Sequence, residues 1–147
     1  MATVESMIVV AAPVERVYAI ARDVEQFPEF MSDVQSVEIL EEDGGRRVSR
    51  WVGLIEEFNR TLEWTEEDHW NDEEYSCRFE MIEGDFTEYS GTWTFEEDEA
   101  GTLAKLIVDY EYAVPLIGPL IKKLLHRKVQ GNCDNMLAAI KEQAEKD

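Results

Sequence analysis

The sequence is poor in cysteine and histidine, the two residue types most used for metal sites and nucleophilic catalysis. Cys77 and Cys133 lie far apart with no CxxC spacing, so neither a disulfide framework nor a zinc site is predicted. Both thiols are expected to be small buried hydrophobes. His69 and His126 have no triad or ligand spacing around them and are expected at the surface, in polar surroundings. The sequence therefore predicts no metal, no cofactor and no catalytic residue.

Long apolar runs are also missing. Residues Met1 to Met7 lack the basic region and the apolar run of about 7 to 15 residues that mark a signal peptide. No later stretch approaches the roughly 20 apolar residues of a membrane-spanning helix. A cytoplasmic protein is predicted.

Positive charge is scarce, because 33 Asp and Glu face 14 Lys and Arg and give a formal net charge of −19. This charge repels a phosphate backbone, so nucleic acid is excluded as a partner. Where the apolar pattern lapses, the acids form clusters that are expected to be solvated turns. These clusters are Glu66-Glu67-Asp68, Asp72-Glu73-Glu74 and Glu96-Glu97-Asp98-Glu99.

Apolar material is sufficient for one core, since 44% of the 147 residues are hydrophobic and 10% are aromatic. No repeat or linker divides the chain, and a single domain over residues 1–147 is predicted. Val4 to Val10 alternates with the period of a strand. Pro13 then starts a short helix with an apolar face at Val14, Val17, Tyr18 and Ala21, and Val24 to Met31 forms a second short helical segment around Pro28.

Six further strands follow, and turn signals such as Asp43-Gly44-Gly45 separate them. Their expected ranges are Val34 to Leu40, Arg47 to Glu56, Arg60 to Glu67, Tyr75 to Ile82, Phe86 to Glu96 and Leu103 to Ala113. Glycines at 53, 84 and 91 lie in or beside these strands, where they mark bulges and bends. The sequence thus predicts an α+β fold with a seven-stranded, strongly curved antiparallel sheet.

One long helix is expected from Leu116 onward, with about six or seven turns. Its apolar stripe consists of Ile117, Ile121, Leu125, Val129, Cys133, Met136 and Ile140. The curved sheet is the one surface large enough to cover that stripe. We therefore expect a space between sheet and helix at the wider end, and this space is the predicted site.

Several motifs resemble a known family. They are the string Ala12-Pro13-Val14-Glu15-Arg16-Val17-Tyr18, the string Asp23-Val24-Glu25-Gln26-Phe27-Pro28-Glu29-Phe30-Met31, and the shorter Glu83-Gly84-Asp85-Phe86 and Gly91-Thr92-Trp93-Thr94-Phe95. Together with the element order they resemble the polyketide cyclase and coenzyme Q-binding branch of the START-like (SRPBCC) superfamily. The resemblance implies a helix-grip fold, in which the sheet wraps around the C-terminal helix. It does not fix function, because members include binding proteins, carriers and cyclases.

The inward strand face and the helix stripe supply the walls of a hydrophobic pocket. The predicted ligand-binding residues are Trp51, Leu62, Trp64, Phe79, Met81, Tyr89, Trp93, Tyr110, Tyr112, Ile121, Leu125, Asn132 and Met136, with Cys77 and Val129 on the same faces. Ordinary core packing explains each of them equally well. The tyrosines and Asn132 are more informative, because buried hydroxyl and amide groups need partners that a ligand could supply.

Two functions are compatible with these walls. The first is a noncatalytic binding or carrier protein for a lipid, a quinone or a polyketide-like molecule. The second is an aromatase/cyclase acting on a poly-β-keto chain, for which the resemblance implies a tryptophan, an arginine and a tyrosine. Trp64 matches the tryptophan, but Asp68 and Val34 stand at the other two positions. Binding without catalysis is therefore favoured. Glu63 or Glu83 could still act as an acid or base, although a lone carboxylate on a strand usually faces solvent.

Two surface features complete the predictions. The basic residues Lys122, Lys123, His126, Arg127 and Lys128 crowd one side of the long helix. This patch is either a solvated helix face or a docking surface for an acidic partner, such as an acyl carrier protein, or for an anionic membrane. Segments Ala113 to Pro119 and Phe27 to Met31 are predicted to form a gate at the mouth of the cavity, or a rigid connector.

Overall fold

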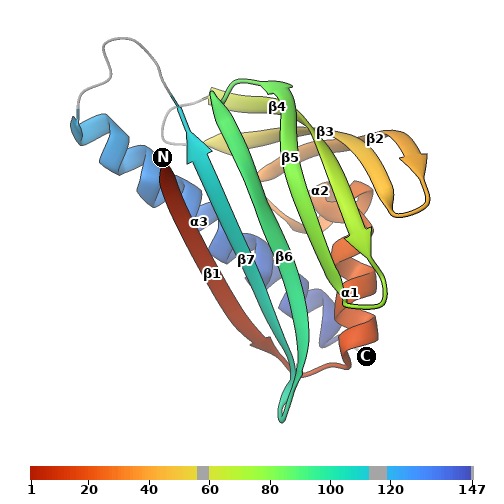
Figure 1. The fold of residues 1–147 in the computed structure, drawn as a ribbon. Helices are drawn as coiled ribbons and strands as arrows, with labels where there is room; N and C mark the ends of the chain where they lie inside the picture. The colour runs from red at the N-terminus through yellow and green to blue at the C-terminus, as the bar shows by residue number, and fades with distance from the viewer. Residues whose placement is uncertain (56–59, 113–118, 147) are drawn as a thin grey trace.

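The computed structural model describes residues 1–55, 60–112 and 119–146, with the side chains of residues 55, 60 and 119–121 excepted. Its elements run β1 (Ala2–Val10), α1 (Val14–Arg22), η1 (Val24–Gln26), α2 (Phe27–Phe30), β2 (Val34–Asp43), β3 (Arg46–Ile55), β4 (Arg60–Asn71), β5 (Ser76–Gly84), β6 (Glu88–Asp98), β7 (Gly101–Glu111) and α3 (Pro119–Ala144). Antiparallel neighbours form a seven-stranded sheet in the order β1-β7-β6-β5-β4-β3-β2, and α3 crosses one of its faces (Figure 1). The predicted helix-grip fold is confirmed.

Most element bounds differ from the predicted ones by one to four residues, and β4 differs in a way that matters. It was expected to end at Glu67 but continues to Asn71, because the strands β3 and β5 pair with it on both sides through this acidic stretch. Register shifts lie beside Gly53 and Gly84, as the glycine pattern predicted. At Gly91, a Cβ atom would come within 2.0 Å of the Ile107 carbonyl oxygen, so only glycine fits there.

The C-terminal half of α3 is fixed to the start of the chain. Leu137 is 1% exposed and Ile140 is fully buried, and both belong to the main hydrophobic cluster. The Ser6 hydroxyl donates to Asp134, and the Lys141 ammonium donates to the Val9 carbonyl oxygen at 3.0 Å. Hydrogen bonds of this kind hold α3 along β1, where the two elements run in the same direction. We call this part of the molecule the closed end.

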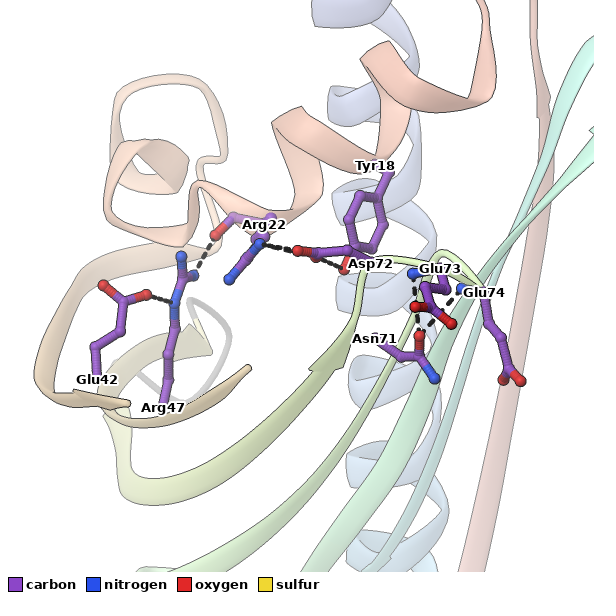
Figure 2. A network of polar contacts seen from close by, with 8 residues as sticks. All are labelled: Tyr18, Arg22, Glu42, Arg47, Asn71, Asp72, Glu73 and Glu74. Atoms are coloured by element: carbon purple, nitrogen blue, oxygen red, sulfur yellow. Dashed lines mark hydrogen bonds and ion pairs between the residues drawn. The ribbon is translucent and has the colours of Figure 1, made fainter. Parts of the chain in front are cut away.

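Helix α1 belongs to the closed end and is held there by a polar network (Figure 2). The Tyr18 hydroxyl donates to Asp72 at 2.6 Å, and the Arg22 guanidinium binds both oxygens of the same carboxylate at 2.8 Å. Arg47 donates to the Arg22 carbonyl oxygen, and Asn71 caps the β4–β5 turn by accepting two backbone N–H groups. The hydrogen bond from Tyr18 lowers the pKa of Asp72, so this carboxylate stays ionised as the common acceptor.

Within the described ranges, no helix is long and apolar enough to cross a membrane. The cytoplasmic location stays a prediction.

Candidate functional site

A cavity of about 70 Å³ lies between the sheet and the middle of α3. Most of its lining is apolar or aromatic and comes from β3 to β7, from α3 and from the segment before β2. The lining residues are Asp33, Val34, Trp51, Gly53, Leu62, Trp64, Glu66, Phe79, Phe86, Tyr89, Trp93, Leu106, Val129, Asn132, Cys133 and Met136. The predicted space between sheet and helix therefore exists.

The aromatic part of the wall is continuous. Trp51 and Trp64 stack with their ring centres 6.0 Å apart, and Trp64 contacts Tyr89 at 4.9 Å. Phe86 then lies 4.7 Å from Tyr89. Such contacts between rings add to the burial of their apolar area, so these side chains hold one another in place around the cavity.

Eight of the thirteen predicted ligand-binding residues line this cavity: Trp51, Leu62, Trp64, Phe79, Tyr89, Trp93, Asn132 and Met136. Tyr110, Tyr112 and Leu125 instead border a separate groove near the start of α3. Met81 borders a different hollow, because the β5–β6 pairing ends at Glu80 and Ser90 and β5 then diverges from β6. The side chain of Ile121 lies outside the described residues.

The sequence reasoning missed two acidic residues at the cavity. Glu66 and Asp68 were predicted to lie in a solvated turn, but each is only 4% exposed. The prediction was wrong because it assigned adjacent acids to a turn. Strand β4 continues through them, so Glu66 and Asp68 point to the same inner face of the sheet as Leu62 and Trp64. The exposed residues Glu63 and Glu83, by contrast, face solvent as expected.

Hydrogen bonds satisfy the two buried carboxyls. The Trp64 indole N–H donates to Glu66 Oε1 at 2.7 Å. The Ser49 hydroxyl donates to Asp68 Oδ2 at 2.6 Å, and Ser49 in turn accepts from the Trp51 indole at 2.9 Å. A further hydrogen bond joins Glu66 to Asp68. Two of the cavity tryptophans thus serve both as apolar wall and as support for the acidic pair.

Burial shifts the titration of both acidic residues. Burial raises the pKa of Glu66 well above its usual range, and the charge of Asp68 raises this pKa further. Burial also raises the pKa of Asp68, although hydrogen bonds from Glu66 and Ser49 oppose that change. Burial therefore favours the protonated form of both carboxyls, and that of Glu66 more strongly. Burial likewise raises the pKa of Tyr89, so its hydroxyl stays protonated.

The groove at the start of α3 contains a second polar contact. Tyr110 and His126 lie with their rings stacked, and the Tyr110 hydroxyl is 3.0 Å from His126 Nδ1. His126 is half-buried, so the prediction of a histidine in purely polar surroundings was wrong. His69 is exposed and contacts Glu67 at 2.7 Å, as a surface histidine was expected to be. The described residues contain no group of three side chains suited to a metal ion.

The segment before β2 connects the sheet to α3 at the cavity. The Asn135 amide donates to Asp33 Oδ2 at 2.8 Å, and the Leu54 N–H donates to the Asp33 carbonyl oxygen at 2.9 Å. Phe27 is fully buried and packs against Trp51 at 5.8 Å. The predicted gate at Phe27 to Met31 therefore adjoins the cavity, but its opening stays a prediction. Its other half, Ala113 to Pro119, lies outside the described residues except for Pro119 at the start of α3.

Comparison with known proteins places this arrangement in a family. The model of the family described as polyketide cyclase / dehydrase and lipid transport matches residues 10–137. The chain belongs to this family. A protein of Streptomyces halstedii named "Putative polyketide cyclase" is 31% identical over 104 residues, which cover 70% of this chain and 95% of that protein.

Solved structures agree with the fold. The protein TTHA0849 from Thermus thermophilus is 35% identical, covers 97% of both chains and superposes with a TM-score of 0.92. The Zhui aromatase/cyclase from Streptomyces sp. R1128 is 23% identical, with coverage of 98% of this chain and 93% of that chain and a TM-score of 0.89. At 23% identity, the similarity to the aromatase/cyclase shows the fold alone.

Proposed function

We propose that the protein binds a hydrophobic small molecule, namely a lipid, a quinone or a polyketide-like compound, between the sheet and α3. The observation that carries this proposal is the aromatic cavity, in which apolar walls surround a small number of polar groups. Membership of the polyketide cyclase / dehydrase and lipid transport family supports it. The thirteen predicted binding residues divide accordingly. Eight line the proposed site, and Tyr110, Tyr112 and Leu125 line the groove beside it.

The cavity is small for such ligands. Its volume of about 70 Å³ is well below the roughly 300 to 1,000 Å³ of typical ligand sites. Binding therefore requires the walls to separate. The N-terminal half of α3 is the part proposed to move. The C-terminal half is held along β1 by Asp134 and Lys141, whereas the first half has the Tyr110–His126 contact and the hydrogen bond from Gln130 to the Glu5 carbonyl oxygen.

Mass spectrometry of organic extracts from natively purified protein tests the proposal. We expect a hydrophobic compound to co-purify with the wild type and to be lost from Val129→Phe, which fills the cavity wall. The variant Ala138→Phe adds the same ring at an exposed position of α3 and serves as the control. If wild-type extracts are empty and no member of a hydrophobic panel raises the melting temperature, the proposal is wrong.

A second candidate function is that of an aromatase/cyclase, which the names of the related proteins favour. In this case the aromatic walls would fold a poly-β-keto chain and position it for aldol closure. Trp64 lies in the cavity wall at the position where this activity is expected to need a tryptophan. However, the expected arginine position is occupied by the buried carboxyl of Asp68, which cannot polarise a carbonyl as a guanidinium does.

Product analysis with a minimal polyketide synthase separates the two functions. A cyclase should shift the products away from the spontaneous mixture, and Trp64→Ala should reverse that shift. Tyr110→Phe tests the groove in the same assay. An unchanged mixture with the wild-type protein would exclude the cyclase while leaving ligand binding intact.

We also propose that the basic face of α3 docks an anionic surface, either an acidic carrier protein or an anionic membrane. Lys122, Lys123 and Arg127 are exposed, and Lys128 is half-buried beside them. Lys122 and Lys123 border the groove that also contains Tyr112, so this face lies at the half of α3 proposed to move. The opposite charge of the rest of the protein orients such an encounter.

A further inference from the structure

The cavity has a polar side that consists of one acceptor and one donor. Glu66 lines the cavity, is 4% exposed, and offers carboxyl lone pairs beyond the one used by Trp64. Tyr89 lines the same cavity, and within the described part of the chain its hydroxyl takes part in no hydrogen bond. Trp64 connects the two groups, because its indole N–H donates to Glu66 and its ring lies 4.9 Å from the Tyr89 ring. A tyrosine hydroxyl can donate and accept at once, so a polar group of a ligand in the cavity is the expected partner.

We propose that the Glu66 carboxyl, backed by Asp68, and the Tyr89 hydroxyl form a recognition centre that takes one uncharged hydroxyl group of an aromatic ligand and rejects carboxylates. The inference rests on the proposed function, because it assumes that the cavity binds a hydrophobic molecule. It narrows that function to a ligand class: hydroxylated aromatic compounds are bound, and fatty acids and other organic anions are not.

A hydroxyl group matches the centre because it is one donor and an acceptor at once. The ligand hydroxyl can donate a hydrogen bond to Glu66, and its oxygen can accept one from Tyr89. A ketone could only accept a hydrogen bond from Tyr89, and a hydrocarbon could bond to neither Tyr89 nor Glu66. Each of these ligands would leave a buried polar group of the protein without a partner, at a cost of about 1 to 3 kcal/mol.

A carboxylate is excluded by charge. In the proposed centre Glu66 and Asp68 share one proton, so the pair carries one negative charge inside a largely apolar enclosure, and a second anion beside it is strongly disfavoured. Arg47, opposite Asp68 on β3, and His69 lower the pKa of Asp68, but burial outweighs them. Arg47 is bound to Glu42 and to the Arg22 carbonyl oxygen, and His69 contacts Glu67 on the other face of β4.

Three probes with the same rings test the centre: 2-naphthol, 2-methylnaphthalene and 2-naphthoate, titrated calorimetrically at pH 7. We expect 2-naphthol to bind about tenfold more tightly than 2-methylnaphthalene, which corresponds to one net hydrogen bond. We expect 2-naphthoate to bind at least about tenfold more weakly than 2-naphthol, because of the charge of the pair.

Four variants assign the preference to individual groups. Tyr89→Phe and Glu66→Leu should bind 2-naphthol and 2-methylnaphthalene equally. Glu66→Gln should keep the preference, because its amide oxygen still accepts a hydrogen bond and its N–H still reaches Asp68 as the protonated acid does. Asp68→Asn removes the charge of the pair and should allow 2-naphthoate to bind.

The failures of the two proposals are distinguishable. If 2-methylnaphthalene binds as tightly as 2-naphthol to the wild type, the recognition centre is wrong while hydrophobic binding stands. The same conclusion follows if 2-naphthoate binds as tightly as 2-naphthol, or if Tyr89→Phe and Glu66→Leu leave the preference unchanged. If none of the probes binds and native extracts are also empty, both the centre and the proposed function are wrong.

Discussion

The two halves of α3 differ in how they pack against the sheet, although they belong to one helix. At the closed end, Leu137 and Ile140 are almost fully buried, and side-chain hydrogen bonds tie the helix to β1 and α1. In the other half, which we call the open end, Val129 borders the cavity and Leu125 borders the groove. The last turns of α3 thus complete the hydrophobic core, whereas its first turns border the groove and its middle, which also includes Asn132, Cys133 and Met136, lines the cavity.

This difference indicates how a protein of this size combines stability with room for a ligand. Because the closed end is fully packed, it can hold the sheet and the helix together while the open end changes its spacing. The polar residues follow the same division. Asp72, which anchors Tyr18 and Arg22 at the closed end, is an exposed carboxylate whose pKa is lowered, whereas burial raises the pKa of Glu66 in the cavity wall.

The largest effect is expected from a matched pair of leucine truncations on α3. Leu137→Ala at the closed end should lower the free energy of unfolding by an amount in the upper part of the range of about 2 to 5 kcal/mol, because a tightly packed site cannot collapse around the lost atoms. Leu125→Ala, beside the groove, should cost less, near the lower limit of that range. Urea unfolding of both variants makes the comparison. Equal losses would contradict the division of α3 into two halves.

Ligand binding should strengthen the open end selectively. A ligand at 100 times its dissociation constant adds about 2.7 kcal/mol to the free energy of unfolding. Hydrogen exchange should slow most at Phe27 to Met31 and along the first half of α3, since Phe27 packs on the cavity residue Trp51 and the first half of α3 borders the groove. The closed-end amides of β1 are the internal control. Slow exchange of Phe27 to Met31 in the empty protein, equal to that of the central strands, would rule out a gate there.

A pH titration tests the buried pair. A carboxyl with a raised pKa binds its proton more tightly in the folded state, so the stability contributed by Glu66 is complete below about pH 4.5 and is lost as the pH rises above that value. Each extra proton held by the folded state gives a slope of about −1.4 kcal/mol per pH unit. Glu66→Gln removes this pH-dependent contribution, so its free energy of unfolding should rise relative to that of the wild type as the pH increases from about 5 to about 8.

The control for this titration is Glu63→Gln, three residues earlier on the same strand, where the carboxylate is exposed and pairs with Arg50. The free energy of unfolding of Glu63→Gln should not rise relative to that of the wild type as the pH increases. If Glu66→Gln and Glu63→Gln behave alike, the proton is not held by the buried pair.

The sequence predicts the fold well because the fold depends on periodicity. The alternation of Val4, Ser6 and Val10, the helical spacing of α1, and the Asp43-Gly44-Gly45 turn each fix a local element whose burial then agrees with the pattern. The glycines beside register shifts also carry a local signal that can be read without the structure. These features involve residues close in sequence, and they are therefore accessible to pattern analysis.

The site is only partly predictable, for two physical reasons. Period-two alternation indicates which side chains face inward, but it does not say where along a strand the helix leaves space, so Tyr110 and Leu125 were placed in the cavity although they border the groove. Acidic residue types usually indicate exposure, but Glu66 and Asp68 are buried. Their burial is possible because Trp64 and Ser49 donate to them, and such a pairing depends on neighbouring positions and strands rather than on local sequence.

The smallest effect on stability is expected at the basic face of α3, where the change should appear in binding instead. Lys123→Glu at the open end should alter the free energy of unfolding by no more than about 0.5 kcal/mol, because the side chain is exposed. It should, however, weaken binding to vesicles that contain anionic lipid or to an acidic carrier protein, and raising the salt concentration should weaken the wild type in the same direction. Lys146→Glu makes the same charge change near the other end of the helix, at the closed end, and should leave this binding almost unaltered. Equal losses for both variants would mean that only net charge matters. In that case the protein has no docking face at the open end, and the two ends of α3 differ in packing alone.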